Sequence, residues 1–236
     1  MIQFQQEDTL SPDPVVMMGT QHRCLRGPLD QRLAEASVRR VDPKQFVFIQ
    51  GDPTTNVHWI ESGAVSLCKM LPDGRRQILG FAYAGDFIGL GAQGERVISA
   101  QAITPTRVRS ISSERLHRIA AGDPDLSFRL YQTLAAELAE ARDLMLTTGH
   151  RSASERVAAF LIALSRRNRR GGKPRDIIDL PMTRADIGDY LGLTIETVSR
   201  TITKLKNARL IDLPQSARIH LLNITELERL AGGRQD

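Results

Sequence analysis

The segment from Thr183 to Leu205 places the strongest local constraint on how this chain can fold. Thr183 and Asp186 have the spacing of a helix N-terminal cap, and Thr194 can cap a second helix further on. Between the two caps stands Gly192, and glycine adopts a positive φ without steric cost. The segment therefore predicts two capped helices joined by a sharp turn, an arrangement typical of the helix-turn-helix motif.

The second helix of this pair divides into an apolar and a polar side. Val198, Ile202 and Leu205 recur at helical spacing and are expected to pack inward. An ordinary amphipathic helix pair would explain this spacing equally well, but it would not explain the glycine turn, both caps and the polar side together. The side chains that point outward in this arrangement are Glu196, Ser199, Arg200 and Thr203.

These outward groups have the chemistry of side chains that recognise bases in the major groove of DNA. Arginine can donate two hydrogen bonds to guanine, glutamate can accept one from cytosine, and serine can do either. Because the first two turns of a recognition helix reach the base edges, the predicted base-reading residues are Glu196, Ser199 and Arg200. The predicted contacts to the DNA backbone are Thr183, Arg184, Thr194, Thr197 and, downstream, Arg218.

The segment after the second helix has the pattern of a wing. Residues 209–222 predict two short strands around a turn, and the following ITELERLAG predicts a helix. Arg218 lies in the second of these strands, where it could contact the DNA backbone. The last third of the chain is therefore expected to form a winged helix-turn-helix.

Charge is distributed unevenly along the 236 residues. The stretch from Arg151 to Asp236 contains 16 basic and 10 acidic residues, against 16 and 17 in residues 1–150, so all of the excess positive charge lies in the last third. A basic segment beside a near-neutral one suggests a polyanionic partner, with nucleic acid first. The alternative explanation is that the basic residues only keep the protein surface soluble.

From Phe46 to about Val108 the chain alternates short β-rich runs with turns. The turns carry Gly, Pro, Asp and Ser, and no helical pattern separates the runs. Strands this short, spaced by about ten residues, predict an antiparallel barrel or sandwich. The runs are FVFI, VHWIESGAVSLCKM, QILGFAY, ISAQAI and RVRSI.

A long helix is predicted next, because Asp123-Pro124 opens a pattern that persists to about Thr148, before Gly149 ends it. Two apolar rows run along this helix. It could pack on its own barrel alone, but two rows favour the barrel on one side and the same helix of a second copy on the other. The row expected to form the homodimer interface is Tyr131, Leu134, Leu138, Ala141 and Met145, and the second row is Leu126, Leu130 and Leu144.

A basic stretch lies between this helix and the helix-turn-helix. Ser152 and Glu155 resemble a capping box for a helix that is expected to run to about Arg166. The sequence RRNRRGGKPRD then follows. Such a run is either a solvated surface or a neighbour of DNA phosphates, and its composition leaves both open.

Several functional classes are not expected from the remaining residues. Cys24 and Cys68 are too few for a disulfide framework or a four-thiolate metal site, and the five histidines lack ligand spacing. No catalytic motif is present, so an enzyme is not expected. No apolar run approaches a membrane span and the N-terminus lacks a signal-peptide pattern, so we expect a cytoplasmic protein without a membrane partner.

The order of barrel, long helix and winged helix-turn-helix, with the motif Glu196-Thr-Val-Ser199-Arg200, resembles the CRP/FNR superfamily of bacterial transcription regulators. The stretch DLPMTRADIGDYLGLTIETVSRTITKLKNARLI is similar to the FixK type of its FNR-like branch. The resemblance covers the chain from about residue 30 and implies an α+β fold. The implied parts are an arm (1–30), a double-stranded β-helix or β-roll like that of cyclic-nucleotide-binding domains (31–122), a dimerisation helix (123–149) and a winged helix-turn-helix domain (150–236).

The resemblance also bears on what the barrel senses. Members that bind cAMP carry G-D-F-I-G-E and later R-S-A, whereas here Leu90 takes the place of the carboxylate and Ile98 that of the arginine. An apolar pair cannot balance a buried phosphate, so cAMP is not expected. Two cysteines cannot hold the iron–sulfur cluster of an oxygen-sensing member. We therefore expect no cofactor and no bound effector, with gating by an unidentified small ligand or haem as the alternative.

For the FNR-like branch, the recognition motif implies an inverted repeat with half-sites of the TTGA kind. Glu196, Ser199 and Arg200 of each protomer would read them. The resemblance further implies an activator that has RNA polymerase as its second partner. It also implies a role in the control of genes for low-oxygen metabolism or nitrogen fixation.

Overall fold

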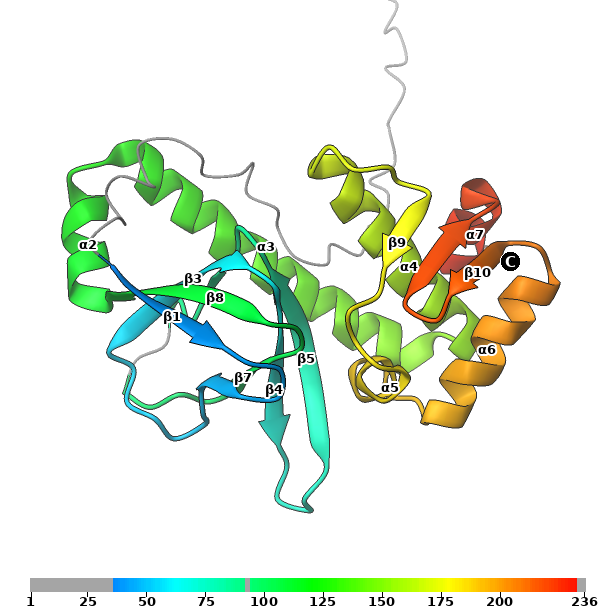
Figure 1. Ribbon diagram of the computed structural model, residues 1–236, viewed down its shortest axis with the longest axis horizontal. Helices are drawn as coiled ribbons and strands as arrows, with labels where there is room; N and C mark the ends of the chain where they lie inside the picture. Colours follow the sequence, from blue (N-terminus) through cyan, green and yellow to red (C-terminus); the bar gives the residue numbers. More distant parts are fainter. Residues whose placement is uncertain (1–35, 92–93, 233–236) are drawn as a thin grey trace, which may run out of the picture.

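The computed structural model describes residues 36–91 and 94–232, and these form the α+β architecture that the resemblance implied (Figure 1). A β-rich half lies at one end, a helical half at the other, and one long helix runs behind the first toward the second (Figure 1). The expected arm of residues 1–30, with Cys24, lies outside the described residues.

The β-rich half, called the barrel below (residues 37–112), consists of two four-stranded antiparallel sheets. Alternating apolar side chains from both sheets fill its interior, including Val41, Ile60, Val65 and Val108. One sheet has the order β1 (Ser37–Val41), β8 (Thr106–Ser112), β3 (Asn56–Ser62) and β6 (Phe87–Ile88). The other has the order β2 (Phe46–Phe48), β7 (Ser99–Ala102), β4 (Ala64–Met70) and β5 (Arg76–Tyr83).

Two helices follow the barrel. The first, α2 (Ser113–Ala121), was not expected from the sequence; it is capped by Ser112, whose hydroxyl accepts from the Arg115 N–H. The long helix α3 (Pro124–His150) continues through Gly149, where the sequence analysis ended it. Of its second row, Leu126 and Leu130 pack against the barrel as predicted, whereas Leu144 packs against the larger core that includes the head.

The helical half, called the head below (residues 152–232), begins with α4 (Ala153–Arg170). The predicted capping box is present, since the Ser152 hydroxyl accepts from the Glu155 N–H and the Glu155 carboxylate accepts from the Ser152 N–H. A three-stranded sheet of order β10-β11-β9 forms the wing. Its elements are β9 (Ile177–Asp179), α5 (Arg184–Leu191), α6 (Ile195–Asn207), β10 (Ile211–Gln215), β11 (Arg218–Leu221) and α7 (Ile224–Ala231).

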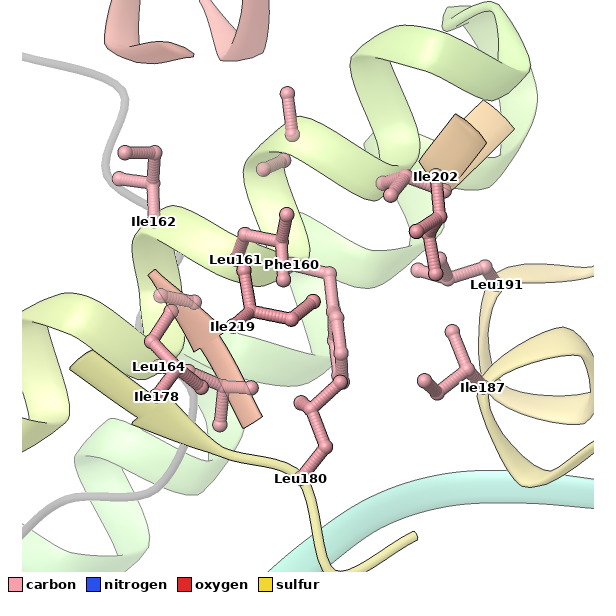
Figure 2. Close-up of a cluster of buried hydrophobic side chains, with 14 of the residues drawn as sticks. Phe160, Leu161, Ile162, Leu164, Ile178, Leu180, Ile187, Leu191, Ile202 and Ile219 are labelled. Carbon is pink, nitrogen blue, oxygen red and sulfur yellow. The ribbon is translucent and has the colours of Figure 1, made fainter. Parts of the chain in front are cut away.

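One apolar core joins the head to the barrel. Figure 2 shows its head portion, in which side chains of α4, α5, α6, β9 and β11 converge. The same cluster includes Cys68 and Phe81 of the barrel. The Phe81 ring lies 6.3 Å from that of Phe160 on α4 and 5.4 Å from that of Tyr190 on α5. The orientation of the head on the barrel is therefore fixed in part by apolar packing.

Candidate nucleic-acid interface

The first helix of the helix-turn-helix, α5, starts at the predicted cap. Thr183 Oγ1 accepts from the Asp186 N–H at 3.1 Å, and Asp186 Oδ2 accepts from the Thr183 N–H at 2.9 Å. Partial burial of Asp186 acts against its ionisation, but the bonds from Thr183 and from Arg76 outweigh that effect and hold its pKa below the usual range. The negative charge that results lies at the positive end of the helix dipole.

The turn between the two helices is as sharp as the sequence predicted. Gly192 adopts a φ of +65°, and its N–H donates to the Gly188 carbonyl. The Leu193 N–H donates to the same carbonyl at 3.0 Å. Thr194 then caps α6, because its hydroxyl accepts from the Thr197 N–H at 3.2 Å. These local bonds fix the direction in which α6 leaves the turn.

The apolar side of α6 is buried and its polar side is exposed, as predicted. Val198 and Leu205 are almost fully buried, whereas Glu196, Ser199 and Arg200 are exposed on the first two turns. Arg200 Nη2 lies 3.4 Å from Thr197 Oγ1, to which it donates. Three side chains with complementary hydrogen-bonding chemistry thus share one open surface of the same helix.

The charge state of Glu196 suits a hydrogen-bond acceptor. Its own backbone N–H, the Thr194 hydroxyl and the positive charge of Arg200 together lower its pKa. The carboxylate is therefore ionised at neutral pH and offers only acceptor positions. Arg200 beside it offers only donors.

The predicted backbone contacts are spread over the α5 start, the α6 start and the wing. Thr183, Thr194 and Thr197 lie at helix N-termini, where backbone N–H groups attract anions. Arg184 is half-buried, which lowers its pKa, and its guanidinium donates to the Ser216 carbonyl in the wing turn at 3.4 Å. Arg218 already donates to Asp179 at 2.8 Å, so its guanidinium is held at the edge of the wing sheet.

The basic stretch of residues 166–176 begins inside α4, which continues to Arg170 and does not end near Arg166 as expected. Arg169 and Lys173 are exposed, as a solvated surface or a phosphate neighbour requires, but other members of the stretch are not. Arg167 is buried and forms an ion pair with Asp86 of the barrel at 3.0 Å, so it faces neither solvent nor a phosphate. Arg166 and Arg175 instead approach Glu228 of α7, at 3.7 and 3.0 Å. Part of the positive charge that suggested a polyanionic partner therefore forms ion pairs within the fold.

The apolar row predicted for self-association is uncovered in the single chain. Tyr131 is 67% exposed and Met145 75%, and they belong to one apolar stripe, which is a more informative feature than single exposed apolar residues. Phe128, which the sequence analysis missed because it falls outside the heptad spacing, stacks against Tyr131 with ring centres 6.5 Å apart. The remaining members of the row, Leu134, Leu138 and Ala141, are also exposed.

The barrel interior contains a buried arginine that the sequence analysis overlooked. Arg96 is 4% exposed, and its guanidinium donates to the carbonyls of Gly89, at 3.1 Å, and Asn56. It lies over the Phe48 ring with Cζ 4.3 Å from the ring centre. A side chain at position 89 would collide with it, since a Cβ there would stand 2.1 Å from Arg96 Nη1. The one available sign was an arginine two residues before Ile98, between the two segments compared with cAMP-binding members.

His58 shares this interior. It stacks on the Phe48 ring at 5.6 Å and its Nδ1 forms a hydrogen bond with Ser110 Oγ at 2.8 Å. Burial, and then the charges of Arg96 and Arg39, lower the pKa of His58 to about 4, so the ring is neutral at pH 7. Leu90 and Ile98, the two apolar replacements noted in the sequence, pack against apolar clusters of the barrel.

Two further observations concern metal sites and membrane spans, neither of which the sequence leads us to expect. Within residues 36–91 and 94–232, no three His, Cys, Asp or Glu side chains are grouped as a metal site requires. Nor does that part of the chain contain a helix that combines the length and apolar character needed to cross a bilayer.

Two family models match the chain. Residues 38–123 match the cyclic nucleotide-binding domain, and residues 155–230 match the Crp-like helix-turn-helix domain. The first match covers the barrel with α2, and the second covers most of the head.

Among known proteins, the chain is 43% identical to the nitrogen fixation regulation protein FixK of Bradyrhizobium diazoefficiens, over 79% of this chain and 78% of that protein. It is 39% identical to the transcriptional activatory protein AadR of Rhodopseudomonas palustris, over 82% of each. Among solved structures, FixK2 of Bradyrhizobium japonicum superposes with a TM-score of 0.78 at 35% identity, covering 84% of this chain and 98% of that one.

Proposed function

The chain belongs to the CRP/FNR family of transcription regulators, in its FixK type, and from this premise we propose that it activates genes by binding an inverted repeat in duplex DNA as a homodimer. The half-sites are of the TTGA kind that the recognition motif implies. The protein is a regulator with a helix-turn-helix DNA-binding domain and not an enzyme.

The exposed trio on α6 carries this proposal. Arg200 donates to guanine, Glu196 accepts from cytosine, and Ser199 adjusts to either partner. Thr183, Arg184, Thr194, Thr197 and Arg218 hold the phosphates on either side. Arg218 must share its guanidinium with Asp179 to do so, and this makes it the weakest member of that group.

The exposed row on α3 supports the position that we propose for the second copy. An apolar stripe with this spacing is buried when the same helix of another protomer packs against it in a coiled coil. A two-fold pair of heads matches a palindromic operator, because helix-turn-helix dimers bind half-sites about one helical turn apart. We accordingly divide the chain into a sensor-like barrel (31–122), a dimerisation helix (123–149) and a DNA-binding domain (150–236).

The barrel interior supports activity without a bound effector. Arg96, Phe48 and His58 occupy it with the chain's own side chains, and Leu90 and Ile98 offer no polar group to a cyclic nucleotide. The regulator therefore needs no ligand to reach its DNA-binding form, and it works in the cytoplasm with RNA polymerase as its second partner. The names of the relatives, which concern nitrogen fixation and transcriptional activation, favour a role in nitrogen-fixation genes. The resemblance to the FNR-like branch adds genes for low-oxygen metabolism to this proposal.

The test is a footprint of the purified protein on genomic DNA with no small molecule added. Protection of inverted repeats with TTGA-type half-sites is expected. Optical spectra and the intact mass of the same preparation should show the bare polypeptide. Dependence of binding on an added ligand, or a retained chromophore, would instead establish a gated regulator.

A further inference from the structure

The hairpin of β4 and β5 binds the first helix of the helix-turn-helix directly. Arg76 Nη2 lies 2.6 Å from Asp186 Oδ1, and its Nε lies 2.9 Å from Asp189 Oδ2. The neighbouring Gln77 donates from Nε2 to the Asp189 carbonyl at 2.6 Å. One edge of the barrel therefore contacts both carboxylates of α5 and its backbone.

A second polar link joins the barrel to α4. Asp86 Oδ2 accepts from Arg167 Nη2 at 3.0 Å and from the Tyr83 N–H at 2.8 Å. The Arg167 guanidinium lies over the Tyr83 ring, 4.1 Å from its centre. Since Arg167 and Asp86 are both buried, their ion pair offsets part of the cost of removing two charges from water. The head is thus attached to the barrel at two different helices.

These attachments leave the DNA-binding surface open. In Figure 1, α6 lies on the side of α5 that faces away from the barrel. Asp186 and Tyr190 are largely covered, whereas Thr183, Glu196 and Arg200 remain exposed. The docked position of the head is consequently compatible with groove binding and does not block it.

We propose that Arg76 is a positioning residue for DNA recognition, which sets the orientation of each head relative to α3 and so the half-site spacing that the dimer accepts. This inference rests on the proposed dimeric function. Asp186 is central to it, because the carboxylate that caps α5 also receives Arg76. Rotation of the head away from the barrel breaks the bonds to Arg76, whereas the capping box moves with α5.

The physical reason is the effective concentration of the second head. Once one head occupies its half-site, the other meets its own at a local concentration fixed by the stiffness of the connection. With a stiff connection, the dimer binds an operator with the matching distance between half-sites much more tightly than other operators. With a loose connection, its affinities for neighbouring distances are more similar. Partly exposed ion pairs add little to folding stability. Replacing Arg76 should therefore change the preference for one half-site spacing more than it changes the melting temperature.

The experiment measures the affinity of the full-length protein for palindromic duplexes that differ only in the number of base pairs between half-sites, together with a single-half-site duplex. The test variants are Arg76→Gln and Asp189→Asn. The matched control is Arg75→Gln, because Arg75 is the adjacent residue and pairs with Asp73 inside the hairpin, without touching the head. Thermal unfolding of each variant reports on folding.

Wild type and Arg75→Gln should prefer one spacing sharply. Arg76→Gln and Asp189→Asn should reduce that preference by about three- to tenfold, with affinity for the single half-site unchanged. Adding Asp189→Asn to Arg76→Gln should change little further, because Arg76→Gln already removes the bond that Asp189 receives.

A spacing profile identical to that of the wild type in both variants would overturn the inference, as would tighter binding of Arg76→Gln to every duplex, which would mark the contact as inhibitory. A wild-type protein without preference for any palindrome would instead overturn the proposed function. If Arg76→Gln fails to fold, Asp189→Asn alone decides the matter.

Discussion

Gly188 of α5 lies directly against the Leu193 carbonyl of the turn that follows, so that a Cβ on residue 188 would stand 2.6 Å from that oxygen. No real Cβ atom tolerates such a distance to a backbone oxygen. The absence of a side chain at position 188 is what allows α6 to begin so soon after α5 ends.

Gly188→Ala should therefore destabilise the protein, although glycine to alanine inside a helix normally stabilises by up to about 1 kcal/mol. The expected cost is about 1–3 kcal/mol, because the turn must open to admit the methyl group. Urea unfolding measures it. Gly149→Ala is the matched control, since Gly149 lies in α3, where an added methyl group would have no described neighbour within 4 Å, and it should be neutral or slightly stabilising. Equal effects of the two changes would contradict the close contact.

Arg200→Ala should weaken binding to a specific operator by about 1–3 kcal/mol and relax the preference for guanine at one position of each half-site. Arg200 is exposed on the second turn of α6 and takes no part in the core, so folding should be unaffected. Competition binding with operators altered at that guanine measures the change.

Arg184→Ala provides the contrast to that variant. A residue that contacts phosphate should weaken binding to all sequences alike and reduce the slope of affinity against salt concentration. If Arg200→Ala behaves in the same uniform way, its assignment to base recognition is wrong.

Tyr131→Glu combined with Leu138→Glu should convert the dimer to monomers that bind the operator far more weakly. Both side chains are exposed on α3, so their replacement spares the core while placing like charges across the proposed interface. Leu134 is a less clean choice because it also lies over Gly91 of the barrel.

Sedimentation velocity measures the oligomeric state of this variant. Gln132→Glu supplies the control, since residue 132 is exposed on a different side of α3 and should leave the dimer intact. Monomers with undiminished affinity for the operator would refute the dimeric mode of binding.

His58 should make folding stability depend on pH between about 4 and 6.5. Its pKa is about 4 in the folded barrel and 6.5 in a free chain, so the unfolded chain binds the proton first as the pH falls. The contribution is fully present above pH 6.5 and is lost toward pH 4. It amounts to about 2 kcal/mol between pH 7 and pH 5.

Urea unfolding at one protein concentration, at pH 7 and at pH 5, measures this loss. His58→Gln removes the titrating group and keeps a polar side chain near Ser110, so its stability should change less between the two pH values. An unchanged pH dependence would show that His58 is not the group responsible.

The helix-turn-helix could be predicted closely because its determinants are local. Both caps, the glycine turn and the polar side of α6 depend on residues within a few positions of one another, and the structure has each as expected. The barrel was foreseen as a class, but β1 and β6 were missed. Four of the five β1 residues are exposed, and β6 contains two residues, so neither carries an alternating apolar pattern of useful length.

The contacts between barrel and head could not be predicted from the sequence. Arg167 and Asp86 are 81 residues apart, and Arg76 and Asp186 are 110 apart, so no spacing rule relates them. Arg167 stands in a basic run that resembles a solvated surface, and only the folded chain shows that it is buried. Arg96 was overlooked for a related reason, because a lone arginine in a glycine-rich stretch is usually exposed.

The shared core of barrel and head has a consequence for exchanging parts between relatives. Cys68, Ile78 and Phe81 belong to the barrel by chain order but to the head by packing. A hybrid protein joined at the end of α3 would set a foreign β4–β5 surface against this α4 and α5 and would leave poorly filled space between them. The unit that could be transplanted intact is therefore discontinuous in the gene. In homologous regulators, residues 68–83 of the barrel must change together with the head residues that they contact.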